Sequence, residues 1–453
     1  MRDGPLASLS DLLLGSHGSA SLRERLVAGV AGLLTLRVAF GGLAFLLALT
    51  LARTLGTEGV GTYSYALAWV TLLGAPAILG MDLLIVRELA GFQLRSEWGL
   101  MRGMLRTANG VVLFTSLGLV SVVVPTSWML RTRTSPEALT TLWVALPLVP
   151  LIAMTRVRQA TLQGLHRVVM GSVPERLILP ATLLALLFAF RVGRVPLSAT
   201  VAMTLNVGAT ILAFAVGAWM LHRHFPAAAR AATPVFQVER WIRGGLPVLL
   251  LNSVGVVFSQ ADTLIVGALK GSAAVGLYSV ADKSADLLTF VLIAQSAAFA
   301  STAASLHAQK DIATLQRLTT RIARLTLLTA APLGVLLIGA GHGFLALFYG
   351  AEFVPAQRAL VFLSIGQLVN VAAGLNGMLL IMTDQAGAAV RVVAASAALN
   401  VGLNLLLVPT WGIEGGAVAN MISLIAWNVL ATWALHAKTG IHSSVLGVLR
   451  PRG

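Results

Sequence analysis

The sequence predicts an all-α integral membrane protein with about twelve transmembrane helices, arranged as two parallel six-helix bundles around a central cavity. The first supporting observation is composition: mean hydropathy is +0.86 and only 11% of residues are charged, against about 25% in soluble domains. The second is a series of apolar runs of about 20 residues, long enough to cross the hydrocarbon layer. Because these runs are continuous rather than alternating, they indicate helices, which satisfy their own backbone hydrogen bonds in lipid. The third is an internal repeat.

The repeated stretch occurs at 56–73 and again at 271–288, at an offset of 215, which is close to half of the 453 residues. Each copy begins at a glycine between two apolar runs. One difference stands out: Ala66-Leu67-Ala68-Trp69 in the first copy is replaced by Ala281-Asp282-Lys283-Ser284 in the second. The identical pairs are Gly56/Gly271, Val60/Val275, Gly61/Gly276, Tyr63/Tyr278, Ser64/Ser279, Ala66/Ala281, Leu72/Leu287 and Leu73/Leu288. We therefore expect two similar halves, with charge in the second half where the first is apolar.

The expected spans follow the apolar runs in chain order. They cover 27–52, 60–86, 107–130, 138–158, 169–190, 198–221, 245–269, 274–304, 322–349, 356–382, 386–408 and 413–436. The predicted organisation is an N-terminal segment (1–26), a first bundle (27–221), a linker (222–244), a second bundle (245–437) and a tail (438–453). Since each half has an even number of spans, both halves enter the membrane in the same orientation, as a parallel repeat about an axis along the membrane normal.

Basic residues are distributed unequally between the two sides of this topology. Of the 32 lysines and arginines, 23 fall in the termini and even-numbered connections and seven in the odd-numbered ones. The positive-inside rule then predicts a multi-pass membrane protein with the N-terminal segment, linker and tail all cytoplasmic. The net charge of +15 is thereby assigned to contact with membrane lipid headgroups, and no nucleic-acid partner is expected.

Enzymatic motifs are not found in the sequence. Cysteine is absent, which excludes disulfides and thiolate metal sites. None of the four lysines lies in a Walker-type phosphate loop, and no H-E-x-x-H motif occurs. We expect a transporter rather than an enzyme, without a bound metal or organic cofactor.

Ionisable residues within spans are costly in lipid and mark functional candidates. Asp262 lies about ten residues before the turn at Gly271, and Lys283 about eleven residues after it. Equal distances from a turn mean equal depth, roughly 15 Å by helical rise, so we expect an ion pair between them. Asp282 and Asp286 are close enough in sequence to join this cluster. The cluster is either a structural salt bridge or a cavity-facing group that binds a coupling cation or an anionic headgroup.

Three further polar residues complete the predicted substrate- and ion-binding set. Arg37 lies about eleven residues into the first span, and its planar guanidinium suits phosphate, although it could instead snorkel to the interface. Its repeat counterpart is Asn252, and Gln260 lies further along the same span. Such amides can bind sugars or join helices by hydrogen bonds.

Four segments in order resemble bacterial polysaccharide-biosynthesis flippases of the MATE-like multidrug/oligosaccharidyl-lipid/polysaccharide exporter superfamily, over about 28–437. The first is LARTLGTEGVGTYSYALAWVTLL with GMDLLIVREL, similar to the first helical hairpin. RQATLQGLHR with PERLILP resembles the fourth and fifth helices. GLPVLLLNSVGVVFSQADTLIVG with VGLYSVADK resembles the seventh and eighth. LNLLLVPTWGIEGGAVAN resembles the eleventh and twelfth.

The resemblance implies translocation of an undecaprenyl-diphosphate-linked oligosaccharide across the bacterial cytoplasmic (inner) membrane for surface polysaccharide synthesis. It implies alternating access, coupled to a gradient of Na⁺ or H⁺, and a basic cavity for the diphosphate. Polysaccharide polymerase and chain-length regulator proteins are the implied protein partners. Asp262 and Lys283 match the family's seventh and eighth helices, whereas Arg37 fits by general location only.

Two transporter alternatives share this fold. A cation-coupled multidrug exporter would favour acidic cavity residues, whereas Arg37 and Lys283 favour an anionic ligand. Lipid II flippases usually have two further helices and more cavity arginines than this sequence provides. A polysaccharide polymerase or ligase would need a long outer loop with catalytic groups, and none of the odd-numbered connections is long enough.

Overall fold

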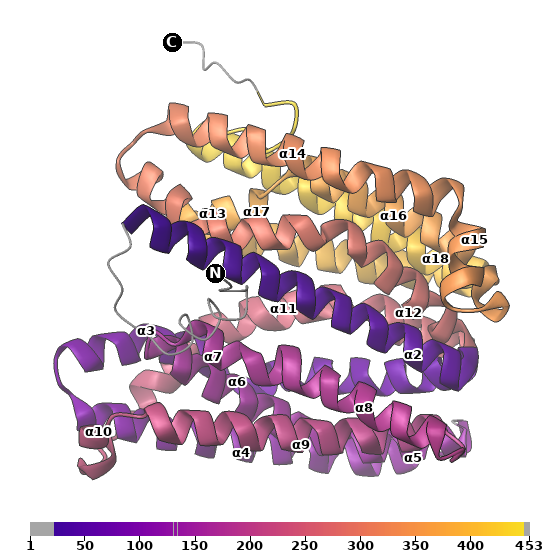
Figure 1. Cartoon of the computed structure of the whole chain (residues 1–453), viewed down its shortest axis with the longest axis horizontal. Coiled ribbons are helices and arrows are strands. Elements are labelled where there is room, and N and C mark those ends of the chain that lie inside the picture. The colour runs from indigo at the N-terminus through magenta and orange to yellow at the C-terminus, as the bar shows by residue number, and fades with distance from the viewer. Residues whose placement is uncertain (1–21, 130, 134, 448–453) are drawn as a thin grey trace, which may run out of the picture.

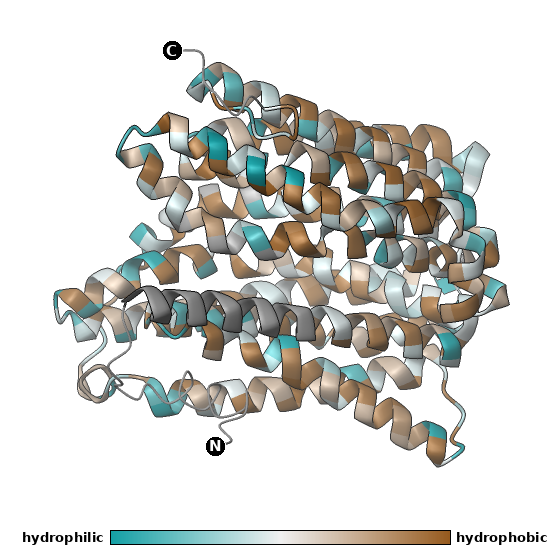
Figure 2. Cartoon of the chain, turned by 45° about the horizontal axis from the view of Figure 1, so that its top comes forward, coloured by the Kyte–Doolittle hydropathy of each residue, from teal (hydrophilic) through white to brown (hydrophobic). Residues whose placement is uncertain are grey.

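A computed structural model describes residues 22–129, 131–133 and 135–447. The chain in these ranges is almost entirely helical. The long helices lie side by side with their axes roughly aligned, and the two halves of the chain form two layers (Figure 1). Hydrophobic residues follow the lengths of the helices, and hydrophilic ones collect toward the helix ends and connections (Figure 2). Large apolar side chains such as Phe114 and Leu406 are strongly exposed, as expected where lipid is the solvent.

The first half contains the helices up to residue 224, followed by a short linking helix. They are α2 (Leu22–Ile78), α3 (Met81–Leu94), α4 (Trp98–Met129), η1 (Arg131–Arg133), α5 (Pro136–Ala145), α6 (Leu148–Gly164), α7 (Val168–Val173), η2 (Pro174–Ile178), α8 (Leu179–Val192), α9 (Ala199–His224) and α10 (Ala227–Ala231).

The second half has the same plan. Its elements are α11 (Val238–Lys270), α12 (Ser272–Asp286), η3 (Leu287–Thr289), α13 (Phe290–Ala308), α14 (Ile312–Gly339), α15 (Gly341–Phe348), η4 (Ala351–Ala356), α16 (Gln357–Ala373), α17 (Asn376–Met382) and α18 (Ala386–Thr439).

Nine helices in the described ranges are long and apolar enough to cross a membrane. Two of them, α2 and α18, each fold back at a glycine with positive φ, Gly56 (φ 67°) and Gly412 (φ 59°). Each therefore contributes two segments, and α12 to α13 adds a further long helical path through the 3₁₀ turn η3. The arrangement is consistent with the twelve spans expected from the sequence.

The glycines that begin the two repeat copies have matching backbone conformations. Gly56 has φ 67° and ψ −177°, and Gly271 has φ 84° and ψ −178°. Side-chain-bearing residues rarely adopt a positive φ, so each reversal of the chain requires glycine at this position. The sequence repeat thus corresponds to a repeat of local structure.

The two halves meet where the repeat copies cross each other, in what we call the α2–α12 crossing. A Cβ atom on Gly61 would lie 1.6 Å from the carbonyl oxygen of Ser272, and one on Gly276 would lie 1.9 Å from that of Thr57. These contacts are reciprocal, because Thr57 and Ser272 are themselves repeat counterparts. Only glycine at both positions allows the two helix backbones to touch.

Two polar contacts join the halves near the same end of the molecule. The hydroxyl groups of Ser64 and Ser279, again repeat counterparts, lie 3.3 Å apart. Arg53 Nε on α2 donates to the carbonyl oxygen of Phe348 on α15 at 2.6 Å. The Ser64–Ser279 pair, like the reciprocal glycine contacts, relates the two halves by a common two-fold axis.

The helix connections alternate between the two ends of the bundle. The described start of α2 and the α3, α7 and α10 regions lie at one end, and α5, α12 and α15 lie toward the other (Figure 1). The connections expected to share the basic side therefore share one end of the molecule. That this end is cytoplasmic stays a prediction.

The segment predicted as a linker and the described part of the predicted tail are both packed. In the linker, Val235 donates its backbone N–H to Gly99 O at 2.9 Å, and Trp241 is 1% exposed. Residues 440–447, here called the C-terminal strap, lie against the end of the second half. Gln316 exchanges two hydrogen bonds with the backbone of His442, at 2.7 and 2.8 Å.

Candidate functional site

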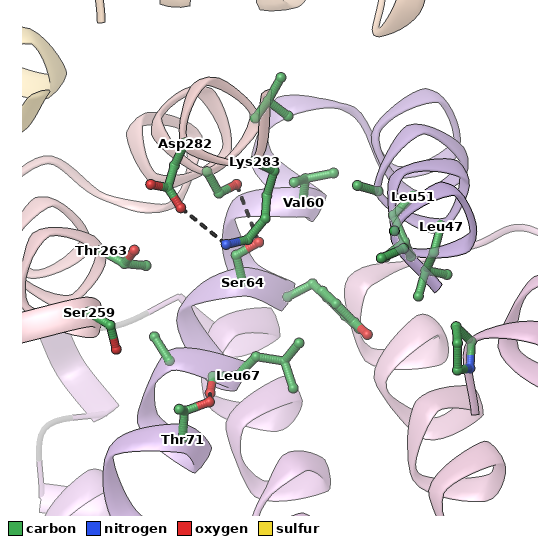
Figure 3. Close-up of a pocket in the computed structure, with 18 of the residues that line it drawn as sticks. Leu47, Leu51, Val60, Ser64, Leu67, Thr71, Ser259, Thr263, Asp282 and Lys283 are labelled. Carbon is green, nitrogen blue, oxygen red and sulfur yellow. Dashed lines mark hydrogen bonds and ion pairs between the residues drawn. The ribbon is translucent and has the colours of Figure 1, made fainter. Parts of the chain in front are cut away.

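A cavity of about 690 Å³ lies between the two halves, as the fold prediction required. The first half contributes α2, η2 and α8, and the second contributes α11, α12 and α13. Leu47, Leu51 and Leu67 form an apolar wall on α2, and Ser259 and Thr263 of α11 lie opposite (Figure 3). Ser64 and Ser279 are also part of the lining, so the α2–α12 crossing borders the cavity.

The second half presents an ionic cluster to this cavity. Lys283 Nζ lies 3.1 Å from Asp282 Oδ2 and 3.3 Å from Asp286 Oδ2. The Lys283 side chain is 59% exposed, and Figure 3 shows it reaching toward Ser64 of the first half with Asp282 beside it. The structure therefore brings together three of the predicted site residues. It places Asp282 and Lys283 in the lining, at positions where the first half has Leu67 and Ala68.

The expected ion pair between Asp262 and Lys283 is wrong. Asp262 is 2% exposed and is not part of the cavity lining. Its carboxylate faces α18 and accepts three amide hydrogen bonds, from Asn400 (2.9 Å), Asn404 (2.6 Å) and Asn420 (2.6 Å). Equal depth in a helical hairpin does not specify which way a side chain points.

The surroundings of Asp262 are rich in oxygen. Asn400 Oδ1 and Asn404 Oδ1 are buried and have no hydrogen-bond partner among the described residues, and the buried Tyr278 hydroxyl lies close to the Asp262 carboxylate. Carboxylate, amide and hydroxyl oxygens are the ligands that hard cations prefer. The described residues contain no cluster of three or more His, Cys, Asp or Glu side chains suited to a metal ion.

The first half adds a charged pair that the sequence reasoning did not assign to the cavity. Glu175 and Arg176 both line it. They lie in η2, a π-helical turn, and such turns shift the register of the residues that follow. The available signal was the PERLILP segment, in which a charged pair lies between Pro174 and Pro180.

Arg158 of α6 holds Glu175 in position. Its guanidinium forms a salt bridge with Glu175 and donates to the carbonyl oxygens of Ala213 (3.2 Å) and Phe214 (2.9 Å). Arg158 is 4% exposed, and a buried charge of this kind requires such partners. Arg176 lines the cavity, and no carboxylate in the described part of the chain forms a salt bridge with it.

The remaining predicted residues have different positions. Gln260 lines the cavity and donates to Ser259 Oγ at 3.2 Å. Asn252 is half-buried on α11 and does not belong to the lining of this cavity. Arg37 belongs to α2, but its side chain lies outside the described part of the structure.

Comparison with known proteins gives a family and a fold. Residues 26–303 match the family described as polysaccharide biosynthesis protein. A probable flippase, AglR of Haloferax volcanii, is 28% identical over 224 residues, which is 48% of this chain and 45% of that relative's length. The match thus spans less than half of the relative.

Solved structures with the same fold are transporters. An inward-facing multidrug resistance MATE family transporter of the MOP superfamily superposes with a TM-score of 0.73, at 13% identity, over 90% of this chain and 98% of that one. The lipid II flippase MurJ, in an inward closed conformation, gives a TM-score of 0.69 at 13% identity, over 89% of this chain and 87% of that one. At these identities the similarity establishes the MATE-like fold.

Proposed function

We propose that this chain, which belongs to the polysaccharide biosynthesis protein family, is a flippase that carries a lipid-linked oligosaccharide across the membrane by alternating access. The observation that carries the proposal is the cavity between the halves, which combines an apolar wall with a cation from each half. Those cations are Arg176 of η2 and Lys283 of α12. A polyprenyl diphosphate has both an anionic group and an apolar tail, so it matches both surfaces.

The cations of the cavity lining would bind the anionic group of the substrate. A diphosphate, such as that of an undecaprenyl-diphosphate-linked glycan, accepts charge-assisted hydrogen bonds from guanidinium and ammonium groups. Lys283 is held by two carboxylates, and a diphosphate would compete with them for its three N–H donors. The hydroxyl groups of Ser64, Thr71, Ser259, Thr263 and Ser279 supply neutral partners for the first sugars.

We further propose that Asp262 is the site of ion coupling, with Na⁺ or H⁺ as the ion. Its carboxylate is surrounded by three asparagines, and each amide can present either its nitrogen or its oxygen. α11 also carries Gln260 and Thr263 of the cavity lining. An ion that favours one packing of α11 on α18 would therefore bias the cavity conformation, by as much as its affinity for the two conformations differs.

We also propose the membrane in which the protein lies and the proteins that use its product. The protein lies in the bacterial cytoplasmic membrane with both termini cytoplasmic, consistent with the 23-to-7 distribution of basic residues. The translocated glycan would then be used by polysaccharide polymerase and chain-length regulator proteins.

A multidrug exporter is the second candidate. Glu175 and Asp282 add two carboxylates to the cavity, and carboxylates suit cationic drugs. Lipid II is a further substrate to compare, because MurJ has the same fold.

The test is transport by the purified protein in proteoliposomes. A fluorescent undecaprenyl-diphosphate oligosaccharide, lipid II and a cationic dye are compared as substrates, with and without Na⁺ and pH gradients. We expect transport of the oligosaccharide lipid, a loss of at least about tenfold in Lys283→Ala and Arg176→Ala, and loss of ion dependence in Asp262→Ala. Lys310→Ala, in the turn between α13 and α14, is the matched control for removal of a lysine.

Transport of the dye alone would instead identify a drug exporter. Wild-type transport of the oligosaccharide lipid by both Lys283→Ala and Arg176→Ala would remove the assigned role of the cavity cations. Correct membrane insertion is checked for each variant by its monodisperse elution in detergent.

A further inference from the structure

A continuous chain of side-chain amides leads from the cavity cluster into the second half. Gln367 Nε2 donates to Asp286 Oδ1 at 3.2 Å, and Asn370 Nδ2 donates to Gln367 Oε1 at 3.2 Å. Asn428 Nδ2 then donates to Asn370 Oδ1 at 3.1 Å, and Asn376 Nδ2 to Asn428 Oδ1 at 2.9 Å. We call these four amides the amide relay.

Every link of the amide relay points the same way, with the donor toward Asp286. This direction has a physical cause: an ionised carboxylate only accepts hydrogen bonds, so Gln367 must offer its NH₂ group and leave its oxygen for Asn370. The same requirement then passes from each amide to the next. Hydrogen bonds in such a chain polarise one another, so the last donor, Gln367, is strengthened toward the carboxylate.

The far end of the amide relay is also fixed. Asn376, which begins α17, lies 3.4 Å from Thr432 Oγ1, and that hydroxyl lies 3.4 Å from Ser443 Oγ in the C-terminal strap. Asn376 and Ser443 are 0% exposed. The short connection between α16 and α17 contains Gly374 (φ 76°), where a Cβ would lie 2.4 Å from Ser443 O. The far end of the amide relay is thus buried between α17, α18 and the C-terminal strap.

At the cavity, Gln367 and Lys283 share one carboxylate. Asp286 Oδ1 accepts from Gln367, while Oδ2 accepts from Lys283 at 3.3 Å. If Gln367 were removed, both oxygens of Asp286 would be free to pair with Lys283. The strength with which Asp286 neutralises Lys283 is therefore set in part by Gln367.

We propose that Gln367, Asn370 and Asn428 are positioning residues, which hold Asp286 toward α16 and so keep Lys283 available for an anionic ligand in the cavity. The inference deepens the proposed function and rests on it for the identity of the ligand. None of these three uncharged residues belongs to the cavity lining, whereas Lys283 does. They would therefore act on Lys283 from outside the cavity.

The first experiment measures binding of undecaprenyl diphosphate to the full chain in nanodiscs. Gln367→Met, which preserves side-chain length, should weaken binding about tenfold, and Asn428→Leu by a smaller factor because it acts through two further links. Asp286→Asn should bind more tightly than wild type, because Lys283 loses a competing carboxylate. Gln367→Met added to Asp286→Asn should have no further effect, which a merely structural amide would not produce.

The matched control is Asn109→Leu, in the first half. Asn109 is a half-buried amide that donates only to the backbone of its own helix, to Leu105 O at 2.8 Å. It should leave binding unchanged. A tenfold loss in Gln367→Met that persists in the Asp286→Asn background would overturn the proposal, as would equal losses in Asn109→Leu and Gln367→Met.

The second experiment requires no substrate. Brief treatment with acetic anhydride acylates lysine amines in their neutral form, and mass spectrometry compares Lys283 with the exposed Lys310 in the same sample. Relative to wild type, Lys283 should react faster in Asp286→Asn and more slowly in Gln367→Met.

The two readouts separate the proposals. If wild type fails to bind undecaprenyl diphosphate but the acylation pattern is as expected, the ligand assignment fails and the amide relay stands. If binding is normal and acylation of Lys283 is the same in wild type and Gln367→Met, the amide relay has no control over Lys283 and the inference fails.

Discussion

Replacing Gly61 with alanine should open the α2–α12 crossing. The added Cβ would lie 1.6 Å from Ser272 O and 2.7 Å from the backbone nitrogen of Gly276, whereas ordinary contact begins near 3.4 Å. Both neighbours are backbone atoms, so no side chain can rotate out of the way. The helices would have to separate by about 1.8 Å, the difference between 3.4 and 1.6 Å.

The energetic cost can be estimated from overpacking in other proteins. Inserting a methyl group into a close contact typically costs about 1–3 kcal/mol. This strain exists only when the crossing is closed. The same free energy therefore shifts the equilibrium from closed toward open crossings, roughly 5- to 150-fold. Gly276→Ala, with its Cβ 1.9 Å from Thr57 O, should have a similar effect.

Disulfide formation between Ser64→Cys and Ser279→Cys reports the crossing directly. The two hydroxyl oxygens lie 3.3 Å apart, so the paired cysteines should oxidise rapidly in the parent chain. Adding Gly61→Ala should slow oxidation by the factor given above. Gly74→Ala is the matched control, because it lies on the same helix and a Cβ there meets nothing within 4 Å. Equal oxidation rates with Gly61→Ala and Gly74→Ala would refute the assignment of a closed, strain-sensitive crossing.

Three further changes test the other contacts. Asp262→Leu should lower the free energy of unfolding by about 3 kcal/mol, because the buried amides of Asn400 and Asn404 and the half-buried amide of Asn420 lose their acceptor; Asp262→Asn should cost less, and thermal unfolding in detergent compares them. Gly217→Ala would place a Cβ 1.6 Å from Arg158 Nη1 and should reduce transport by moving that guanidinium, an effect absent from Gly208→Ala. At the start of α14, the Thr314 backbone N–H donates to Asp311 and lowers the pKa of that carboxyl below its ordinary 3.8. Its stabilisation is present above the ordinary pKa and disappears as pH falls through the lowered one, so Asp311→Ala should lower the unfolding temperature at pH 7, and by progressively less as the pH falls below the ordinary pKa.

The repeat and the fold could be predicted because both depend on short-range sequence features. Gly56 and Gly271 are required by backbone conformation, and apolar runs of membrane length require helices whatever their neighbours are. The sequence also placed Asp282, Lys283 and Asp286 together, since residues within one helical turn must lie close.

The partners of Asp262 could not be found in that way. Its three asparagines lie 138 to 158 residues away on α18, and only the packing of α11 on α18 brings them together. The error over Lys283 has the same origin. A helical hairpin fixes the depth of two residues, whereas the direction of each side chain depends on the rotation of its helix, which neighbouring helices decide.

Glu175 and the amide relay illustrate a second limit. Glu175 lines the cavity from the π-helical turn η2, and the register shift of such a turn is not readable from hydropathy. The link from Asp286 to Gln367 spans 81 residues and that from Asn370 to Asn428 spans 58. Each amide alone is an unremarkable polar residue in an apolar helix.

The reciprocal glycine contact also has an evolutionary consequence. In a symmetric dimer, residue i of one subunit touches j of its partner while j touches i, and Gly61 and Gly276 satisfy this relation within a single chain. A six-helix ancestor that formed such a dimer would have needed one glycine at this contact, and a single mutation would have changed both sides of the contact. In a single chain the two positions are encoded separately and can vary independently, yet a Cβ at either one would meet the backbone opposite. Each half therefore requires its own glycine at this point.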